Sequence, residues 1–209
     1  MDYIKLLNKR YATKAMNGKV APQEKIDNIL EAIRLAPTSS GLQPFEVFVI
    51  TDKAVKSKIK EIAWNQSQVT DCSHLLVFAA WHHYTEDRIN HMFDLTNEIR
   101  GFKNEGWEKY RQQLLSTYPR KDPQKNFEHA ARQTYIALMS AITQATAEGL
   151  DSTPMEGFDS SALDGILSLE EKGLKSTLLL PIGYRDADKD WLVNLKKVRK
   201  PMNELVNYI

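Results

Sequence analysis

The residues best suited to bind a ligand lie in short polar segments spread along the chain. Arg10 and Lys14 are two cations in the segment R-Y-A-T-K, and P-T-S-S-G-L-Q-P at 37–44 places hydroxyls and an amide between two prolines. Proline restricts the backbone on both sides and Gly41 permits a turn with positive φ. Such a stiff loop suits a polar ring system with hydrogen-bonding edges. The alternative is an ordinary connection, because serine and glycine are common in loops.

The spacing of the cations suggests a long anionic ligand. If residues 10–14 are extended, Arg10, Ala12 and Lys14 share one side, and the two cations lie on the order of 13 Å apart. That separation suits opposite ends of one elongated anion, although lysine and arginine are more often solvated surface charges. Lys197 and Arg199, in L-K-K-V-R-K-P-M, would also project together from an extended backbone.

Several familiar sites are missing from the sequence. It contains no G-x-G-x-x-G, no G-x-x-x-x-G-K-[ST] and no G-x-S-x-G, so the common nucleotide-binding loops and the nucleophile elbow are absent. The residues His82, His83, Glu86 and His91 lack the H-E-x-x-H register, so we expect no metal site. Cys72 is a weak candidate for a nucleophile. It is the only cysteine, which excludes an intramolecular disulfide and suits a reducing compartment.

Composition predicts one ordinary domain over residues 1–209. The chain is 42% hydrophobic and 26% charged, with a net charge of +1, which argues against a dedicated nucleic-acid binder. No apolar run is long enough for a membrane span, and the start M-D-Y-I-K-L-L-N-K-R does not fit a signal peptide. We therefore expect a cytoplasmic protein that binds neither nucleic acid nor membrane.

Hydrophobic periodicity predicts the elements that position these segments. Helices are expected over 2–9, 22–35, 52–63, 126–149 and 160–167, with a short one within 65–71, and buried strands over 45–50, 75–81 and 175–183. Residues 85–123 are expected to form a helical excursion away from the sheet. In the longest helix, residues 133–147 include no charged side chain, and Tyr135 and Met139 fall at its core spacing. A helix without a charged face is buried nearly all round, which predicts packing against a second subunit.

Four segments together resemble the FMN-dependent nitroreductases, most closely the oxygen-insensitive NAD(P)H nitroreductase and dihydropteridine reductase type. They are R-Y-A-T-K after the first helix, A-P-T-S-S-G-L-Q-P-F before the first strand, P-M-E-G-F after the long helix and K-V-R near the end. Each motif is weak alone, but their order and spacing match across the whole chain. The resemblance implies an α+β fold with a mostly antiparallel central sheet flanked by helices. It also implies an intertwined homodimer with FMN at the interface.

The resemblance also implies roles for individual residues. The FMN phosphate would be held by Arg10, Lys197 and Arg199, where arginine offers a planar fork of donors. Lys14 would reach the N1/O2 edge of the ring, Asn65 the pyrimidine edge, and Gln133 the phosphate or ribityl region. The ring and ribityl chain would be lined from the other subunit by Pro37, Thr38, Ser39 and Gly41. A backbone N–H near N5 would come from the loop Pro154, Met155, Glu156 and Gly157. The cofactor set is completed by Tyr11, Ala12 and Gln68, and the residues expected to face substrate are Lys14, Ser40 and Gln68.

Two positions depart from the family's pattern. Ala12 stands where a small hydroxyl residue is usual, and Gln68 where a second lysine is frequent. The implied function is transfer of hydride from NADH or NADPH through flavin N5 to a nitroaromatic, quinone or related small molecule, by a ping-pong mechanism in which no side chain need be an acid or base. A flavin or dihydropteridine reductase, a dehalogenating relative and a non-catalytic FMN-binding dimer are the alternatives.

Overall fold

A sheet with helices on both faces forms the centre of the structure, a computed structural model that describes residues 2–209. Within these residues the sheet has four antiparallel strands in the order β1-β2-β4-β3. They are β1 (Phe45–Ile50), β2 (His74–Trp81), β3 (Asp151–Ser152) and β4 (Leu174–Gly183). The predicted fold class is confirmed. The two-residue β3, which pairs with the end of β4, is too short to leave a pattern in the sequence.

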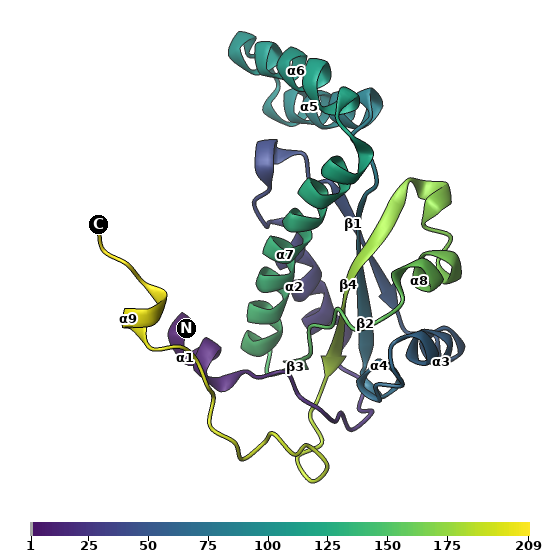
Figure 1. Cartoon of the computed structure of the whole chain (residues 1–209), viewed down its shortest axis with the longest axis vertical. Coiled ribbons are helices and arrows are strands. Elements are labelled where there is room, and N and C mark those ends of the chain that lie inside the picture. The colour runs from purple at the N-terminus through teal and green to yellow at the C-terminus, as the bar shows by residue number, and fades with distance from the viewer. Residues whose placement is uncertain (1) are drawn as a thin grey trace.

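The alternation of side chains along β2 explains the layers on the two sides of the sheet. Leu76 and Phe78 pack with α2 (Gln23–Arg34) and α7 (Pro123–Ala147). Leu75 and Val77 face the opposite way, toward α3 (Lys53–Ile62), α4 (Gln68–Asp71) and α8 (Ser160–Ile166). Successive side chains of a strand point to opposite faces, so a strand covered on both sides is apolar throughout. Figure 1 shows the helices on the two sides of the sheet.

The long helix α7 begins earlier than predicted. Asp122 caps it by accepting a hydrogen bond from the Lys125 amide at 3.1 Å, and Pro123 occupies its first turn, where a missing N–H costs nothing. Leu138 and Ile142 are buried as expected. Tyr135 and Met139 are not part of the core of the single chain, because they are 42% and 37% exposed. One uncharged side of α7 is therefore left uncovered by this chain.

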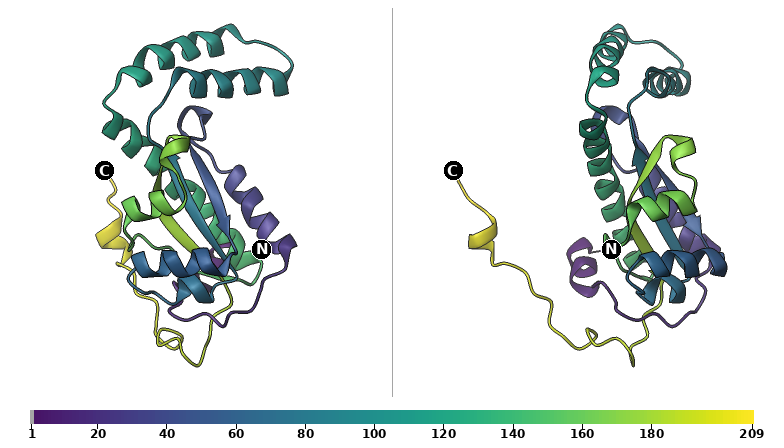
Figure 2. Two further views of the ribbon diagram at one scale, coloured as in Figure 1. Left: turned by 90° about the vertical axis from the view of Figure 1, so that its right-hand side faces the viewer. Right: turned by 45° about the vertical axis from the view of Figure 1, so that its right-hand side comes forward.

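Two helices stand apart from the sheet. Figures 1 and 2 show α5 (Glu86–Arg100) and α6 (Glu105–Thr117) lying side by side beyond the end of the strands. Phe93 and Trp107 stack between them with ring centroids 4.5 Å apart. The short helix η2 (Tyr118–Arg120) then leads into α7.

The terminal segments complete the chain. Helix α1 (Tyr3–Lys9) precedes residues 10–14, η1 (Ser39–Gly41) precedes β1, and η3 (Glu170–Lys172) precedes β4. After β4 the chain runs without regular structure to the short helix α9 (Met202–Leu205), well away from the sheet (Figures 1 and 2). Among residues 2–209, no helix combines the length and apolar character needed to cross a bilayer.

Histidine burial predicts how stability depends on pH. Burial lowers the pKa of His129, and the charges of Lys121 and Arg132 lower it further. Burial followed by the charge of Lys56 lowers the pKa of His74 in the same way. The unfolded chain, with a histidine pKa of about 6.5, then binds protons more readily than the folded chain. The contribution of these histidines to the free energy of unfolding is therefore complete above about pH 6.5. It is lost as the pH falls through their lower pKa values in the folded chain.

We expect the free energy of unfolding to decrease between about pH 7 and pH 5, with a smaller decrease in His129→Gln. Glutamine retains an acceptor for the Tyr84 hydroxyl, which lies 2.8 Å from His129 Nδ1. Urea unfolding at several pH values measures this, with His91→Gln on the exposed side of α5 as the matched control. An unchanged pH dependence in His129→Gln would contradict the assignment.

Candidate functional site

Three cations, Arg10, Lys197 and Arg199, lie together where the C-terminal tail (residues 184–209) passes residues 10–14. The Lys197 ammonium donates hydrogen bonds to the carbonyl oxygens of Leu7 and Arg10 and so attaches the tail to this segment. Burial lowers the pKa of Arg10, and the nearby charge of Arg199 lowers it further. The pKa of Lys197 is also lowered, by burial and then by the charges of Arg10 and Arg199. Like charges this close disfavour one another, so the cluster favours binding of an anion.

No carboxylate in residues 2–209 forms an ion pair with any of these three cations. The Arg10 Nε atom is buried and has no hydrogen-bond partner within the described chain. A buried polar group without a partner costs on the order of 1–3 kcal/mol, so a bound oxyanion would remove a real penalty. The structure thus brings together Arg10, Lys197 and Arg199, the three residues for which the family resemblance implies a phosphate-binding role.

The neighbours of Arg10 on the same segment have structural contacts. The Tyr11 hydroxyl donates to Asp190 at 2.7 Å, and the Arg185 guanidinium lies 4.5 Å from the centre of the Tyr11 ring. Burial and the hydrogen bond to Asp190 raise the pKa of Tyr11 to about 12. Ala12 forms a parallel bridge with Ser152. Lys14 is half-buried and, within residues 2–209, forms no ion pair.

The loop at residues 37–44, with Thr38, Ser39 and Ser40, is the hydroxyl loop, and side-chain hydrogen bonds hold it in place. Gln133 Oε1 accepts from the Ser39 amide at 2.8 Å, and the Thr38 hydroxyl accepts from the Gln43 amide at 3.0 Å. The Ser40 hydroxyl lies 2.6 Å from the Tyr110 hydroxyl of α6. Gly41 has a φ of 63°, as predicted, and Ser40 has a φ of 57°. A left-handed backbone at a residue other than glycine is uncommon and is often found near functional sites.

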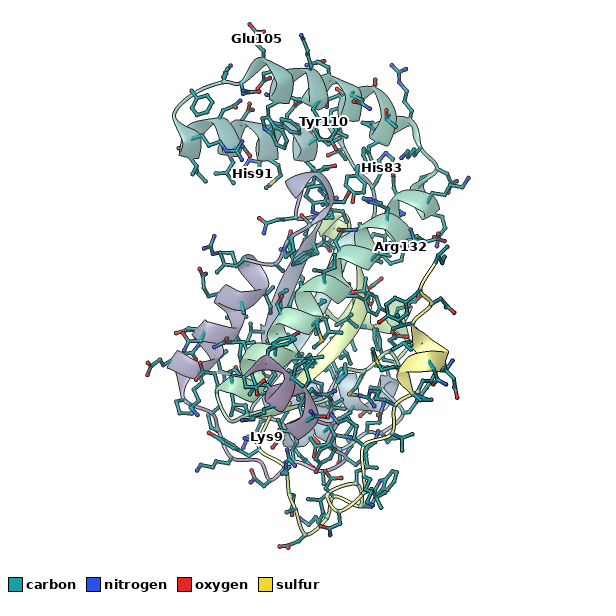
Figure 3. The ribbon with its side chains drawn as sticks, turned by 90° about the vertical axis from the view of Figure 1, so that its left-hand side faces the viewer. Lys9, His83, His91, Glu105, Tyr110 and Arg132 are labelled. Carbon is teal, nitrogen blue, oxygen red and sulfur yellow. The ribbon has the colours of Figure 1, made fainter. Side chains whose placement is uncertain are left out.

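Within one chain, the hydroxyl loop lies beside the middle of α7 and the three cations lie toward its C-terminal end. The loop contacts Gln133, whereas Arg10 lines a cavity together with Thr146 at the C-terminal end of the helix. Thirteen helical residues separate these contacts by roughly 20 Å. Figure 3 shows Lys9, the neighbour of Arg10, low in the view, and Tyr110, the partner of Ser40, on α6 at the top. Gln133 therefore lies beside the loop and not beside the three cations.

The loop at 154–157 presents backbone amides. Met155 is buried and its amide and carbonyl both pair with Leu179 at 2.9 Å. The Glu156 carboxylate accepts a hydrogen bond from the Tyr135 hydroxyl at 2.7 Å. Within residues 2–209, neither the Glu156 amide nor the Gly157 amide donates to an acceptor. Two adjacent unused donors are suited to a ligand atom that accepts hydrogen bonds.

A tryptophan beside this loop was not identified from the sequence. Trp64 is 76% exposed, yet its ring packs so closely on Gly157 that a Cβ atom there would lie 2.5 Å from the ring. Trp64 and Asn65 both have left-handed backbones, with φ of 53° and 54°. The only signal in the sequence that could have indicated Trp64 was its position directly before Asn65. Asn65 itself is exposed. A larger residue at 157 would displace the indole from this position.

Gln68 does not point to solvent. It is buried, and its Nε2 atom donates to the Thr13 carbonyl at 3.3 Å. Gln68 therefore supports the segment that carries Arg10 and Lys14. Within residues 2–209, no group of three or more histidine, cysteine, aspartate or glutamate residues is arranged to hold a metal ion.

Comparisons with known proteins identify the family. The family model described as the nitroreductase family matches residues 7–184. A provisionally named NAD(P)H nitroreductase of Staphylococcus haemolyticus is 31% identical, with 99% of this chain and 96% of that protein covered. A relative in Haemophilus influenzae with the same provisional name is 29% identical over 99% of this chain and 96% of its own length.

Solved structures show the same fold. The crystal structure of a provisionally identified nitroreductase from Bacillus subtilis superposes with a TM-score of 0.85 at 24% identity, covering 99% of this chain and 98% of that one. Another provisionally identified nitroreductase, from Exiguobacterium sibiricum and in complex with FMN, gives a TM-score of 0.83 at 20% identity, covering 100% of this chain and 98% of its own. The resemblance read from the four sequence segments is confirmed: this chain belongs to the nitroreductase family.

Proposed function

We propose that the protein is an FMN-dependent oxidoreductase that transfers hydride from NADH or NADPH to a nitroaromatic, quinone or related acceptor. The observation that carries this proposal is the cluster of Arg10, Lys197 and Arg199, which has no acidic partner within residues 2–209 and contains a buried, unpartnered Nε. A phosphate dianion fits that donor set in charge and in hydrogen-bonding capacity. The names of the relatives and the FMN complex of the related fold support the same reading.

The remaining residues fit the ring system of FMN. Lys14 and the exposed Asn65 offer a cation and a carboxamide to the polar edge of the ring, and the amides of Glu156 and Gly157 are free donors for a ring nitrogen. Bound FMN would supply the hydride chemistry, accepting two electrons at N5 and passing them to the acceptor. The chain's own residues would bind, orient and shield the reacting atoms. We assign no side chain as a general acid or base.

A complete site would need a second copy of the chain. The hydroxyl loop and the cations contact parts of α7 that are roughly 20 Å apart in one chain, so Pro37, Thr38, Ser39 and Gly41 would reach the cofactor from the partner. The uncharged side of α7 borders a groove lined by Tyr3, Leu35, Ile136 and Met139, which supports a homodimer built on this helix. Because donor and acceptor would use the same open side of the ring in turn, we expect ping-pong kinetics.

The alternatives predict different behaviour in one experiment. The purified protein is expected to be yellow, to bleach when NADH or NADPH is added without oxygen, and to regain its colour when a quinone is added. Stopped-flow measurement of the visible flavin absorbance would follow the loss and return of colour. A flavin that stays oxidised with both nicotinamides would overturn the proposal and favour a non-catalytic FMN-binding dimer. A reduced protein that transfers electrons only to free flavin or to a dihydropteridine would identify that reductase instead.

A further inference from the structure

The buried residue Thr13 joins the segments that carry the proposed site. Its hydroxyl lies 2.6 Å from the Asp190 carboxylate at the start of the C-terminal tail. Its carbonyl accepts hydrogen bonds from Gln68 Nε2 at 3.3 Å and from the Thr153 hydroxyl at 2.7 Å. Gln68 follows Asn65 in the chain and Thr153 directly precedes Pro154. The segment at 10–14, the segment at 65–68, the loop at 153–157 and the C-terminal tail thus meet at Thr13, which has no exposed surface.

Asp190 is the part of this junction that belongs to the tail. It is 2% exposed, and its carboxylate accepts from the hydroxyls of Tyr11 and Thr13 and from the Leu192 amide at 3.0 Å. No lysine or arginine in residues 2–209 forms an ion pair with it. Burial alone would raise the pKa of Asp190, but the hydrogen bonds from Thr13 and Tyr11 hold it below its usual value. A charge that is buried and satisfied only by neutral donors fixes those donors firmly.

This geometry orients the cations. Tyr11 and Thr13 reach the same carboxylate, so they share one side of the segment. In an extended segment the alternate residues, which include Arg10 and Lys14, then project from the other side. The same tail continues to Lys197, which bonds to the Arg10 carbonyl, and to Arg199. Asp190 and Lys197 therefore attach the tail to this segment at two points, with the cations beside the second.

We propose that Asp190 is a positioning residue for the cofactor phosphate: by joining Tyr11 and Thr13 to the start of the tail, it fixes Arg10 next to Lys197 and Arg199. The inference rests on the proposed function, because it takes the anion to be the phosphate of FMN. The positioning role of Asp190 and its negative charge act on FMN affinity in opposite directions. A negative charge repels phosphate, so the removal of that charge alone would not weaken FMN binding. Loss of positioning would weaken it.

The experiment compares FMN with riboflavin, which has the same ring and lacks the phosphate. Dissociation constants for the apoprotein would be measured by quenching of flavin fluorescence. We expect Asp190→Asn, which has nearly the same shape, to weaken FMN binding by roughly tenfold and riboflavin binding by no more than about twofold. Asp188→Asn is the matched control, because it removes the same charge from an exposed tail residue whose carboxylate, among the described residues, accepts no hydrogen bond. It should leave the FMN affinity unchanged or slightly stronger.

A second variant tests the same idea with less effect on folding. Tyr11→Phe keeps the ring against Arg185 and removes one donor to Asp190, so it should lower the preference for FMN over riboflavin by a smaller factor. If circular dichroism shows that Asp190→Asn does not fold, Tyr11→Phe decides whether Asp190 has the positioning role. Equal losses for FMN and riboflavin, or FMN binding as tight as in the wild type, would overturn the positioning role. A wild-type protein that does not prefer FMN to riboflavin would instead refute the proposed phosphate site itself.

Discussion

Met139→Asp is expected to convert the protein into a monomer that does not retain FMN. Met139 lies on the uncharged side of α7, next to Ile136, and both are substantially exposed in the single chain at 37% and 43%. In a two-fold dimer built on this side, each substitution would bury an unpaired carboxylate, and symmetry would introduce it twice. A combined cost of about 4 kcal/mol or more would weaken the dimer by about a thousandfold. FMN would be lost as well, because each site would lack the partner's hydroxyl loop.

Sedimentation velocity and the flavin absorbance of the purified variant measure both parts of this prediction. Ile99→Asp is the matched control. Ile99 is 76% exposed on α5, so the same kind of substitution introduces the same charge in a helix outside the proposed interface. It should leave a yellow dimer. A Met139→Asp protein that sediments as a dimer with full flavin content would show that α7 does not form the interface, and a wild-type monomer that holds FMN would refute the dimer altogether.

The elements of the sheet were predictable because burial leaves a strong pattern. β2 is apolar at nearly every position, since helices cover both faces, and the ends predicted for β1 match the structure. The start of α7 was placed three residues late, because Asp122 and Pro123 resemble a break in the chain although they are a good cap and first turn. Tyr135 and Met139 were assigned to a core. Periodicity identifies an apolar side but does not say which chain covers it.

The site was only partly predictable, for a different reason. Cations and the order of short motifs can be read from the sequence, and the structure brings Arg10, Lys197 and Arg199 together. The residues that hold them in place carry no such signal. Asp190 lies in D-A-D-K-D-W, where four charged residues look equally solvated, and only the tertiary fold buries this one. Trp64 was overlooked for a similar reason, because its importance depends on its contact with Gly157 across the chain.

Arg199→Ala should weaken FMN binding by roughly tenfold to a hundredfold, because loss of a charge-assisted hydrogen bond to phosphate costs about 1.5–3 kcal/mol. The fold should change little, since Arg199 is exposed and its one side-chain hydrogen bond within residues 2–209 is to the neighbouring Val198 carbonyl, at 2.6 Å. The measurement is a fluorescence titration of apoprotein with FMN at fixed ionic strength. Salt must be controlled because it screens the attraction of exposed charges.

Two further variants separate the contact from the charge. Lys200→Ala removes the same charge from the next, exposed residue, so a comparable loss of affinity there would mean that only the overall field of the tail matters. Arg199→Lys keeps the charge but loses the planar fork that matches two phosphate oxygens, so it should fall between wild type and Arg199→Ala. Riboflavin should bind equally to all four proteins, because it offers no phosphate. Full flavin occupancy of Arg199→Ala after extensive dialysis would place the phosphate elsewhere, and the C-terminal tail would then have no direct part in holding the cofactor.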